Sequence, residues 1–332
     1  MNMAAEKLED ITYLSSWAIL LVVLGHSYPS LQYSDDILVN SLLWARKHLI
    51  YSYHMPLFMF ISGYLFIHTN RDRDINYIRF VQKKFKRLLV PYFVISTYVF
   101  PVKIFLSQYA DRPVQFNLND YVKSVIYPDD NVIALFWFLP TLFIIFLIAP
   151  IFKKYLVDRK ISVLYLLSVL LIFFNLFNPI KNIKLLSLNC VANLIVFFWM
   201  GCVFYMYRIK FGFIPVILIF MLLVSYSSIY GNSKVALLLT ASSGIFLSYE
   251  IMQRYSSNNY YYLKFIDGYS YQIFLLSWFP QNLIKIILYK NLNVDFIVTF
   301  LSMFLGGLII PVIASKFVKR HAPSLKFVIG AQ

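Results

Sequence analysis

ITYLSSWAILLVVLGHS, from Ile11 to Ser27, is apolar and long enough to cross a bilayer as a helix, which takes ~17–25 residues, and it ends beside His26. HMPLFMFISGYLF opens a second apolar run at His54. Successive spans cross a bilayer in opposite directions, so the end of the first run and the start of the second lie on one side. We therefore expect the two imidazoles to approach each other, and ionisable groups at membrane depth indicate function.

The chain as a whole is strongly apolar. Of its 332 residues, 60% are hydrophobic and 14% are charged, whereas soluble proteins have ~45–50% apolar and ~25% charged residues. This composition predicts an all-α fold, a polytopic transmembrane helix bundle of about ten spans that forms a single integral-membrane domain, 1–332. The predicted spans are 11–28, 52–69, 88–108, 132–152, 161–178, 185–206, 212–230, 234–252, 265–287 and 293–315.

Basic residues agree with this arrangement, because 20 of the 30 Lys and Arg residues lie in alternate connections. These connections are the N-terminus, 70–87, 153–160, 207–211, 253–264 and the C-terminal tail. Cytoplasmic segments carry such an excess, so we expect both termini in the cytoplasm. The net charge of +15 then reflects topology and contact with anionic lipid rather than nucleic-acid binding. No signal-peptide cleavage site follows the first run, which is expected to be a retained span.

Several classes of site are not indicated. Cys190 and Cys202 fall inside one apolar run, which favours neither a disulfide framework nor a zinc site. Nucleotide-binding glycine loops and the GxSxG and HExxH motifs are missing, and no metal is expected. The largest outer connection, about 109–131, shows no persuasive helical or strand periodicity. Residues 231–233 have to make a complete turn between two spans.

His26 and His54 are the candidates for chemistry. An imidazole has an unperturbed pKa suited to proton transfer near neutral pH, so either can act as a general base. The alternative is that each caps a helix or hydrogen-bonds within the bundle. Pro56 suits the first turn of a helix, and the Ser62-Gly63 pair allows a neighbouring helix to approach closely.

A basic cluster follows the second predicted span. Lys83, Lys84 and Arg87 fall near one helical face at the predicted cytoplasmic surface. Such a cluster can hold the phosphates of a cofactor. The alternative is a positive anchor that contacts lipid head groups.

Two further segments allow two interpretations each. Trp137 is expected to be an interfacial anchor rather than a platform on which a sugar stacks. The segment 277–281, SWFPQ, interrupts the predicted ninth span with a proline kink and polar groups. This segment either contributes to a functional site or packs against neighbouring helices. We expect it to pack against neighbouring helices.

Taken in order, these motifs resemble the integral-membrane acyltransferase 3 family. The resemblance is carried by VVLGHS, HMPLFMFISGYLF, KFKRLLVPY, FWFLPTLF and SYQIFLLSWFPQ, and it covers nearly the whole chain. Within the family, the chain looks like the bacterial polysaccharide O-acetyltransferases of the fucose 4-O-acetylase type.

The resemblance implies an enzyme of the bacterial inner membrane. Such an enzyme moves an acetyl group from acetyl-CoA to a hydroxyl of an envelope glycan, for example O-antigen, capsule or exopolysaccharide. The resemblance also implies that His26 and His54 are catalytic, and that Lys84 and Arg87 help to bind coenzyme A or to position the reaction. Lys83, beside them in the basic cluster, is the third residue expected to bind the cofactor.

Three positions depart from the family pattern. Ser15 stands where the family usually has Arg or Lys, eleven residues before the first-span histidine, and Thr12 stands where an acid is common. Ser277 aligns with a ninth-span histidine. These departures leave open a non-catalytic member of a glycan-export assembly. Ten spans with internal polar residues also suit a transporter or flippase for a glycan or lipid precursor.

Overall fold

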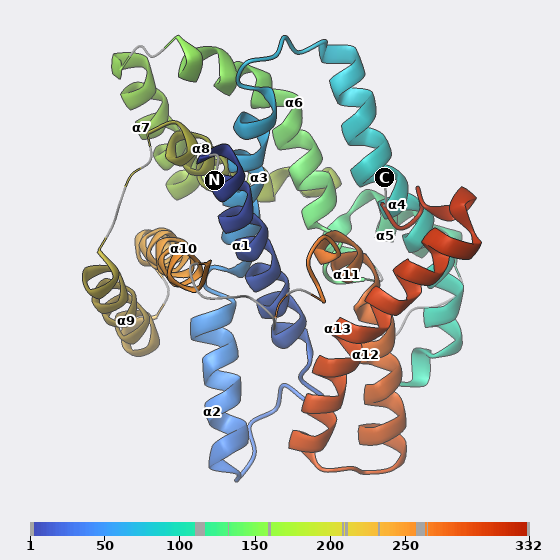
Figure 1. The fold of residues 1–332 in the computed structure, drawn as a ribbon. Coiled ribbons are helices and arrows are strands. Elements are labelled where there is room, and N and C mark those ends of the chain that lie inside the picture. The colour runs from blue at the N-terminus through green and yellow to red at the C-terminus, as the bar shows by residue number, and fades with distance from the viewer. Residues whose placement is uncertain are drawn as a thin grey trace. The chain divides into compact units, whose positions relative to one another are not determined.

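The computed structural model describes residues 3–109, 117–131, 133–158, 161–207, 209, 212–231, 233–256, 263 and 265–330. Helices dominate these ranges, and none of them contains a β-strand (Figure 1). The predicted all-α fold is confirmed.

The helices follow one another with short connections. The α-helices of the described ranges are α1 (Met3–His26), α2 (Ile37–Ala45), α3 (His54–Asn70), α4 (Tyr77–Phe105), α5 (Leu118–Ile126), α6 (Phe138–Val157), α7 (Ile161–Phe177), α8 (Leu188–Tyr207), α9 (Phe213–Tyr230), α10 (Lys234–Ser256), α11 (Ser270–Leu276), α12 (Trp278–Ile284) and α13 (Phe296–His321). Two π-helical segments, η1 (Arg46–Ile50) and η5 (Lys285–Asn291), continue α2 and α12. Four 3-10 segments are η2 (Ser107–Tyr109), η3 (Pro128–Asp130), η4 (Leu185–Ser187) and η6 (Pro323–Leu325).

Within the described ranges, seven helical segments are long and apolar enough to cross a membrane. They are Ile37–Asn70, Tyr77–Phe105, Phe138–Val157, Leu185–Tyr207, Phe213–Tyr230, Lys234–Arg254 and Phe296–His321. Shorter apolar helices lie at Ile11–His26 and Ile161–Phe177. The chain is therefore a multi-pass membrane protein, while the number of ten spans and the cytoplasmic position of the termini stay predictions.

The break predicted at 231–233 is confirmed. α9 ends at Tyr230 and α10 begins at Lys234. Between them Gly231 has φ 85°, a left-handed conformation that glycine adopts without a steric penalty.

The predicted ninth span is broken into α11, α12 and η5. The first break falls at Ser277, and Pro280 lies in the first turn of α12. Proline is tolerated there because the first helical N–H groups have no partner within the helix. The predicted interruption of this span is therefore present.

Two helices lie outside the predicted spans. α2 is capped by Asp36, whose carboxylate accepts from the backbone N–H of Leu38 at 2.7 Å. α5 lies in the connection 109–131, where the sequence showed no persuasive periodicity. Asn117 caps α5 by accepting from the backbone N–H of Asn119 at 2.9 Å. α5 has nine residues, fewer than the ~11–18 residues over which helical periodicity is read from a sequence.

The chain forms two compact units. The first comprises Met1–Ile61 and Arg208–Lys316, and the second comprises Ser62–Tyr207 and Phe317–Gln332. α3 and α13 each contribute residues to both units. That residues 1–332 act as one domain stays a prediction.

In the first unit, α1 is held by helices that are distant in sequence. Trp17 donates from Nε1 to Oγ of Ser248 on α10 at 3.2 Å. A Cβ on Gly307 of α13 would lie 2.9 Å from Cγ1 of Val23 on α1, so glycine permits this approach. Figure 1 shows α9 beside α10 and α12 beside α13.

In the second unit, α3 and α8 pack closely. A Cβ on Gly63 would lie 1.9 Å from the backbone oxygen of Phe198. Sγ of Cys202 lies 3.3 Å from the carbonyl oxygen of Gly63. The close approach expected at the Ser62-Gly63 pair is confirmed. The rings of Phe66, Phe146 and Phe198 pack around this crossing, with centroids 5.6 to 6.3 Å apart.

Candidate active site at the end of α1

The end of α1 places His26 beside an aromatic ring. His26 is the last residue of the helix and is half-buried. Gly25, just before it, is buried, and a Cβ there would lie 2.9 Å from Cε2 of Tyr51. Glycine therefore lets the tyrosine ring pack against the backbone next to the histidine.

Tyr51 brings the two histidines together. Its ring centroid lies 5.7 Å from that of His26 and 4.7 Å from that of His54. Its hydroxyl lies 3.2 Å from Nε2 and 3.5 Å from Nδ1 of His26, so it can bond to either tautomer. The expectation that the imidazoles of successive runs approach each other is confirmed, with Tyr51 in contact with both.

His54 is the first residue of α3 and is only 4% exposed. Its Nδ1 lies 2.9 Å from the carbonyl oxygen of Ile50. A carbonyl only accepts, so Nδ1 carries the proton and Nε2 keeps its lone pair. The helix-end hydrogen bond considered as an alternative is thus present, and it leaves the second nitrogen as an acceptor.

Arg46, in η1, completes the cluster. Its Nε donates to the carbonyl oxygen of Gly25 at 2.8 Å, and its Nη2 donates to the hydroxyl of Tyr51 at 2.9 Å. The guanidinium carbon lies 4.1 Å from the centre of the Tyr51 ring, a cation–π distance. A positive charge is therefore held next to the residue that precedes His26.

Tyr28 ties the chain after α1 to α2. Its hydroxyl donates to the carbonyl oxygen of Leu42 at 2.9 Å. Its ring packs edge-on against Phe296 and Phe300 of α13.

Neither Arg46 nor Tyr51 was predicted from the sequence as a site residue. A signal was present, since Arg46 and Lys47 place two cations on a predicted outer connection, against the positive-inside trend. Tyr51 had no such signal, because the chain contains 26 tyrosines.

The interruption of the ninth span packs against α1. Gln281 donates from Nε2 to the carbonyl oxygen of Val23 at 2.9 Å and to Oγ of Ser27 at 3.0 Å. Packing is thus the confirmed role of Gln281. Ser277, at the break, is fully buried, and its Oγ has no hydrogen-bond partner in the described part of the chain.

The basic cluster of α4 divides into two kinds of side chain. Lys83 and Arg87 are exposed, one helical turn apart. Lys84 is half-buried, and its Nζ lies 3.5 Å from the ring centre of Phe146 and 5.4 Å from that of Phe80. The cluster therefore presents Lys83 and Arg87 at the surface while Lys84 contacts aromatic rings.

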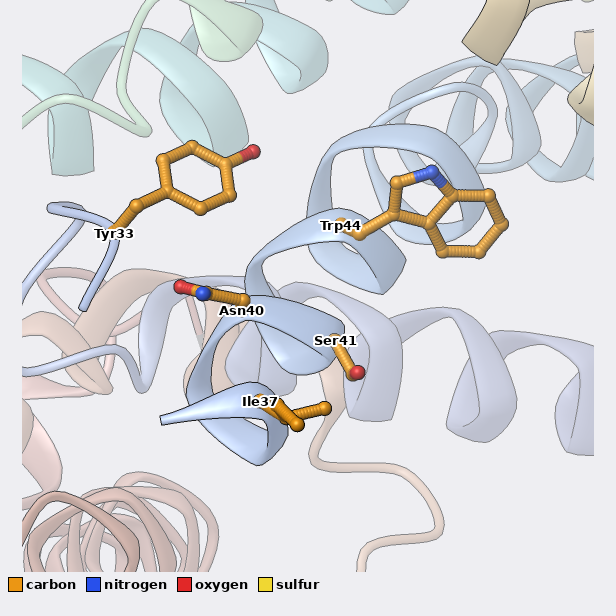
Figure 2. Close-up of a pocket in the computed structure, with 5 residues that line it drawn as sticks. All are labelled: Tyr33, Ile37, Asn40, Ser41 and Trp44. Carbon is orange, nitrogen blue, oxygen red and sulfur yellow. The ribbon is translucent and has the colours of Figure 1, made fainter. Parts of the chain in front are cut away.

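A shallow groove of about 400 Å³ lies along α2 (Figure 2). Its lining residues are Tyr33, Ile37, Asn40, Ser41 and Trp44. Asn40 already bonds both the N–H and the C=O of Ser34, at 3.0 and 2.7 Å. Trp44 donates to Oγ of Ser228 at 2.9 Å. The polar groups of Asn40 and Trp44 thus serve the fold.

Over the described ranges, no group of three or more His, Cys, Asp or Glu side chains is placed to hold a metal ion. The site instead combines imidazoles, a phenol and a guanidinium. Such groups accept and donate protons and stabilise negative charge.

A protein-family model, Acyl_transf_3, described as an acyltransferase domain, matches residues 8–316. The match takes in α1, the turn that carries Tyr51, α3 and the basic cluster of α4. No curated protein and no solved structure matches the chain.

Proposed function

This chain belongs to the acyltransferase 3 family and is a membrane acyltransferase, and we propose that it transfers an acetyl group from acetyl-CoA to a hydroxyl of an envelope glycan. The observation that most supports this proposal is the meeting of His26 and His54 on Tyr51. Acyl transfer to a sugar hydroxyl requires a base for the hydroxyl proton, and an imidazole is suited to that step.

His26 is the proposed general base. It takes the proton as the hydroxyl oxygen attacks the thioester carbonyl carbon. When the C–S bond breaks, the same proton passes from the imidazole to the sulfur of coenzyme A. Such proton transfer contributes ~10²–10⁴-fold to a rate. His54 is the proposed contact to the acceptor, because its Nδ1 is engaged by Ile50 and its Nε2 keeps a lone pair.

The acetyl donor is proposed to bind through the basic cluster. Exposed Lys83 and Arg87 supply charge for the phosphates of coenzyme A, and arginine makes two parallel bonds to a phosphate. Lys84 adds a positive charge to the same helix beside the ring of Phe146. The proposed acceptor is a lipid-linked or polymeric glycan, and the proposed location is the bacterial inner membrane.

The test compares the envelope polysaccharide of a deletion strain with that of strains complemented by wild type, His26→Ala or His321→Gln. His321 is an exposed histidine at the end of α13 and serves as the control. O-acetyl signals are read by NMR before and after mild base, and membrane insertion is checked by fractionation. We expect the signals to return with wild type and His321→Gln, and not with His26→Ala.

A second arm uses purified protein, the polysaccharide of the deletion strain and [14C]acetyl-CoA. Transfer of label to the polysaccharide by wild type supports the proposal. Unchanged O-acetylation on deletion, together with no transfer of label, contradicts it. Movement of a glycan-lipid across vesicles without acetyl-CoA would instead identify a flippase.

A further inference from the structure

We propose that Arg46 is a catalytic residue, whose unoccupied N–H groups hold the oxyanion that forms on the thioester carbonyl during acetyl transfer. This inference rests on the proposed function. It concerns a residue in η1, between the two apolar runs, and it follows from the geometry of one guanidinium.

Two hydrogen bonds hold the edge of the guanidinium formed by Nε and Nη2. Nε donates to the carbonyl oxygen of Gly25, and Nη2 donates to the hydroxyl of Tyr51. These two acceptor oxygens lie 3.2 Å apart, so they match the spacing of that edge. The face of the guanidinium also lies over the Tyr51 ring. Arg46 therefore has a defined orientation before any substrate binds, and such preorganisation is the basis of electrostatic catalysis.

The edge of the guanidinium that carries Nη1 can bind a ligand. Arginine has five N–H donors, and two are engaged by Gly25 and Tyr51. The other three, which include both N–H groups of Nη1, have no acceptor among the residues that the structure describes. The free groups form the fork that binds a carbonyl oxygen or an oxyanion.

Among the residues that the structure describes, the charge of Arg46 also has no protein counterion. Within the described ranges, no Asp or Glu oxygen comes within 4.0 Å of this half-buried guanidinium. A partly desolvated cation without a carboxylate favours negative charge brought by a ligand or formed in a reaction. In the proposed mechanism, such a negative charge forms on the thioester carbonyl oxygen, beside His26.

The chemical step balances with the groups present. The acceptor oxygen bonds to the thioester carbon, the C=O π electrons move to oxygen, and His26 takes the hydroxyl proton. The resulting oxyanion bonds to the N–H groups of Arg46. When the C=O bond forms again, the C–S bond breaks, and the sulfur leaves with the proton held by His26.

Arg46 differs in position from the cation that the family pattern has eleven residues before His26. Ser15 occupies that position, and its Oγ donates to the carbonyl oxygen of Ile11 at 2.8 Å. Eleven residues of helix span ~16 Å, so Ser15 lies three turns away from His26. Arg46 instead lies at the level of His26 itself.

The test uses the [14C]acetyl-CoA assay with the polysaccharide of the deletion strain, and compares Arg46→Gln with Lys47→Gln. Lys47 is the next residue, carries the same charge and is exposed. We expect Arg46→Gln to lower kcat about 10²-fold, with KM for acetyl-CoA and for the polysaccharide nearly unchanged. Lys47→Gln is expected to retain wild-type rates.

Chemical rescue separates catalysis from support of the fold. Arg46→Ala is assayed with guanidinium and, separately, with urea, which has the same shape without the charge. We expect guanidinium to restore kcat about tenfold and urea to have no effect. If both variants fail to fold, as judged by size-exclusion profiles, Arg46→Lys provides the same kcat comparison with the charge kept.

Three outcomes overturn the proposal. Wild-type kcat in Arg46→Gln removes Arg46 from the chemistry. A raised KM for the polysaccharide with unchanged kcat assigns the guanidinium to an anionic group of the acceptor. Failure of the wild type to transfer label overturns the proposed function, and the role of Arg46 with it. The first two outcomes leave the proposed function intact.

Discussion

The hydroxyl of Tyr51 lies 3.2 Å from Nε2 of His26, so the turn before α3 is bonded to the last residue of α1. The same hydroxyl accepts from Nη2 of Arg46 and lies 3.2 Å from the carbonyl oxygen of Gly25. One tyrosine thus sets the spacing between the candidate base and the candidate oxyanion-binding cation.

Tyr51→Phe tests this relationship. The ring remains against His54, while the bonds of the hydroxyl are lost. We expect kcat to fall about tenfold, equivalent to one hydrogen bond of ~1.4 kcal/mol. The measurement is initial velocity with acetyl-CoA at saturation. Tyr33→Phe, at an exposed ring, is the control; equal rates in both variants would show that the hydroxyl of Tyr51 has no part in positioning His26.

His54→Asn separates the two functions of His54. The asparagine amide nitrogen takes the place of Nδ1 and can still donate to the carbonyl oxygen of Ile50, but the side chain lacks the basic nitrogen Nε2. We expect the melting temperature to stay close to that of wild type and kcat to fall at least about tenfold. A variant that melts normally and keeps full activity would limit His54 to its hydrogen bond at the start of α3.

Lys83→Gln and Arg87→Gln test donor binding. Both side chains are exposed on α4, and we expect each change to raise KM for acetyl-CoA about tenfold with little effect on kcat, since each removes a contact to phosphate. Screening should weaken donor binding by wild type as salt increases.

Lys154→Gln is the control for this pair, because Lys154 is an exposed cation near the end of α6. If Lys154→Gln raised KM for acetyl-CoA as much as Lys83→Gln and Arg87→Gln do, the effect would be one of net charge in general. It would remove the cluster of α4 from donor binding.

Gly63→Ala tests the crossing of α3 and α8. The added methyl would lie 1.9 Å from the backbone oxygen of Phe198, and a backbone atom cannot rotate away. We expect the free energy of unfolding to fall by ~1–3 kcal/mol, which is measured as a lower melting temperature in detergent. Gly212→Ala is the control, since its methyl meets ring carbons of Pro215 at 3.2 and 3.3 Å. Equal melting temperatures of Gly63→Ala and Gly212→Ala would mean that α3 and α8 can move apart without loss of stability.

The apolar runs and turn residues of the sequence are enough to place most of the helices. Gly231 marks the end of α9, and the segment around Pro280 marks the break of the ninth span. Such features depend on residues close together in the chain and on the preference of apolar segments for a membrane. α5 was missed because its nine residues are fewer than the ~11–18 over which helical periodicity is read.

The residues of the candidate site could also be predicted only in part from the sequence. His26 and His54 follow from the sequence, because two consecutive spans must return to the same side of a bilayer. The places of Arg46 and Lys84 do not follow from it. Both are cations in basic segments, yet one is bonded to Gly25 and Tyr51 and the other rests on the ring of Phe146.

By itself, the sequence determined a multi-pass helical membrane protein with a histidine at the end of one apolar run and at the start of the next. Hydrophobicity and chain direction decide both features, and they can be counted residue by residue. Only the tertiary structure decided that Tyr51 joins the histidines, that Arg46 faces Gly25 and that Gln281 packs on α1. These contacts depend on side-chain direction and on close packing between helices, which no local pattern encodes.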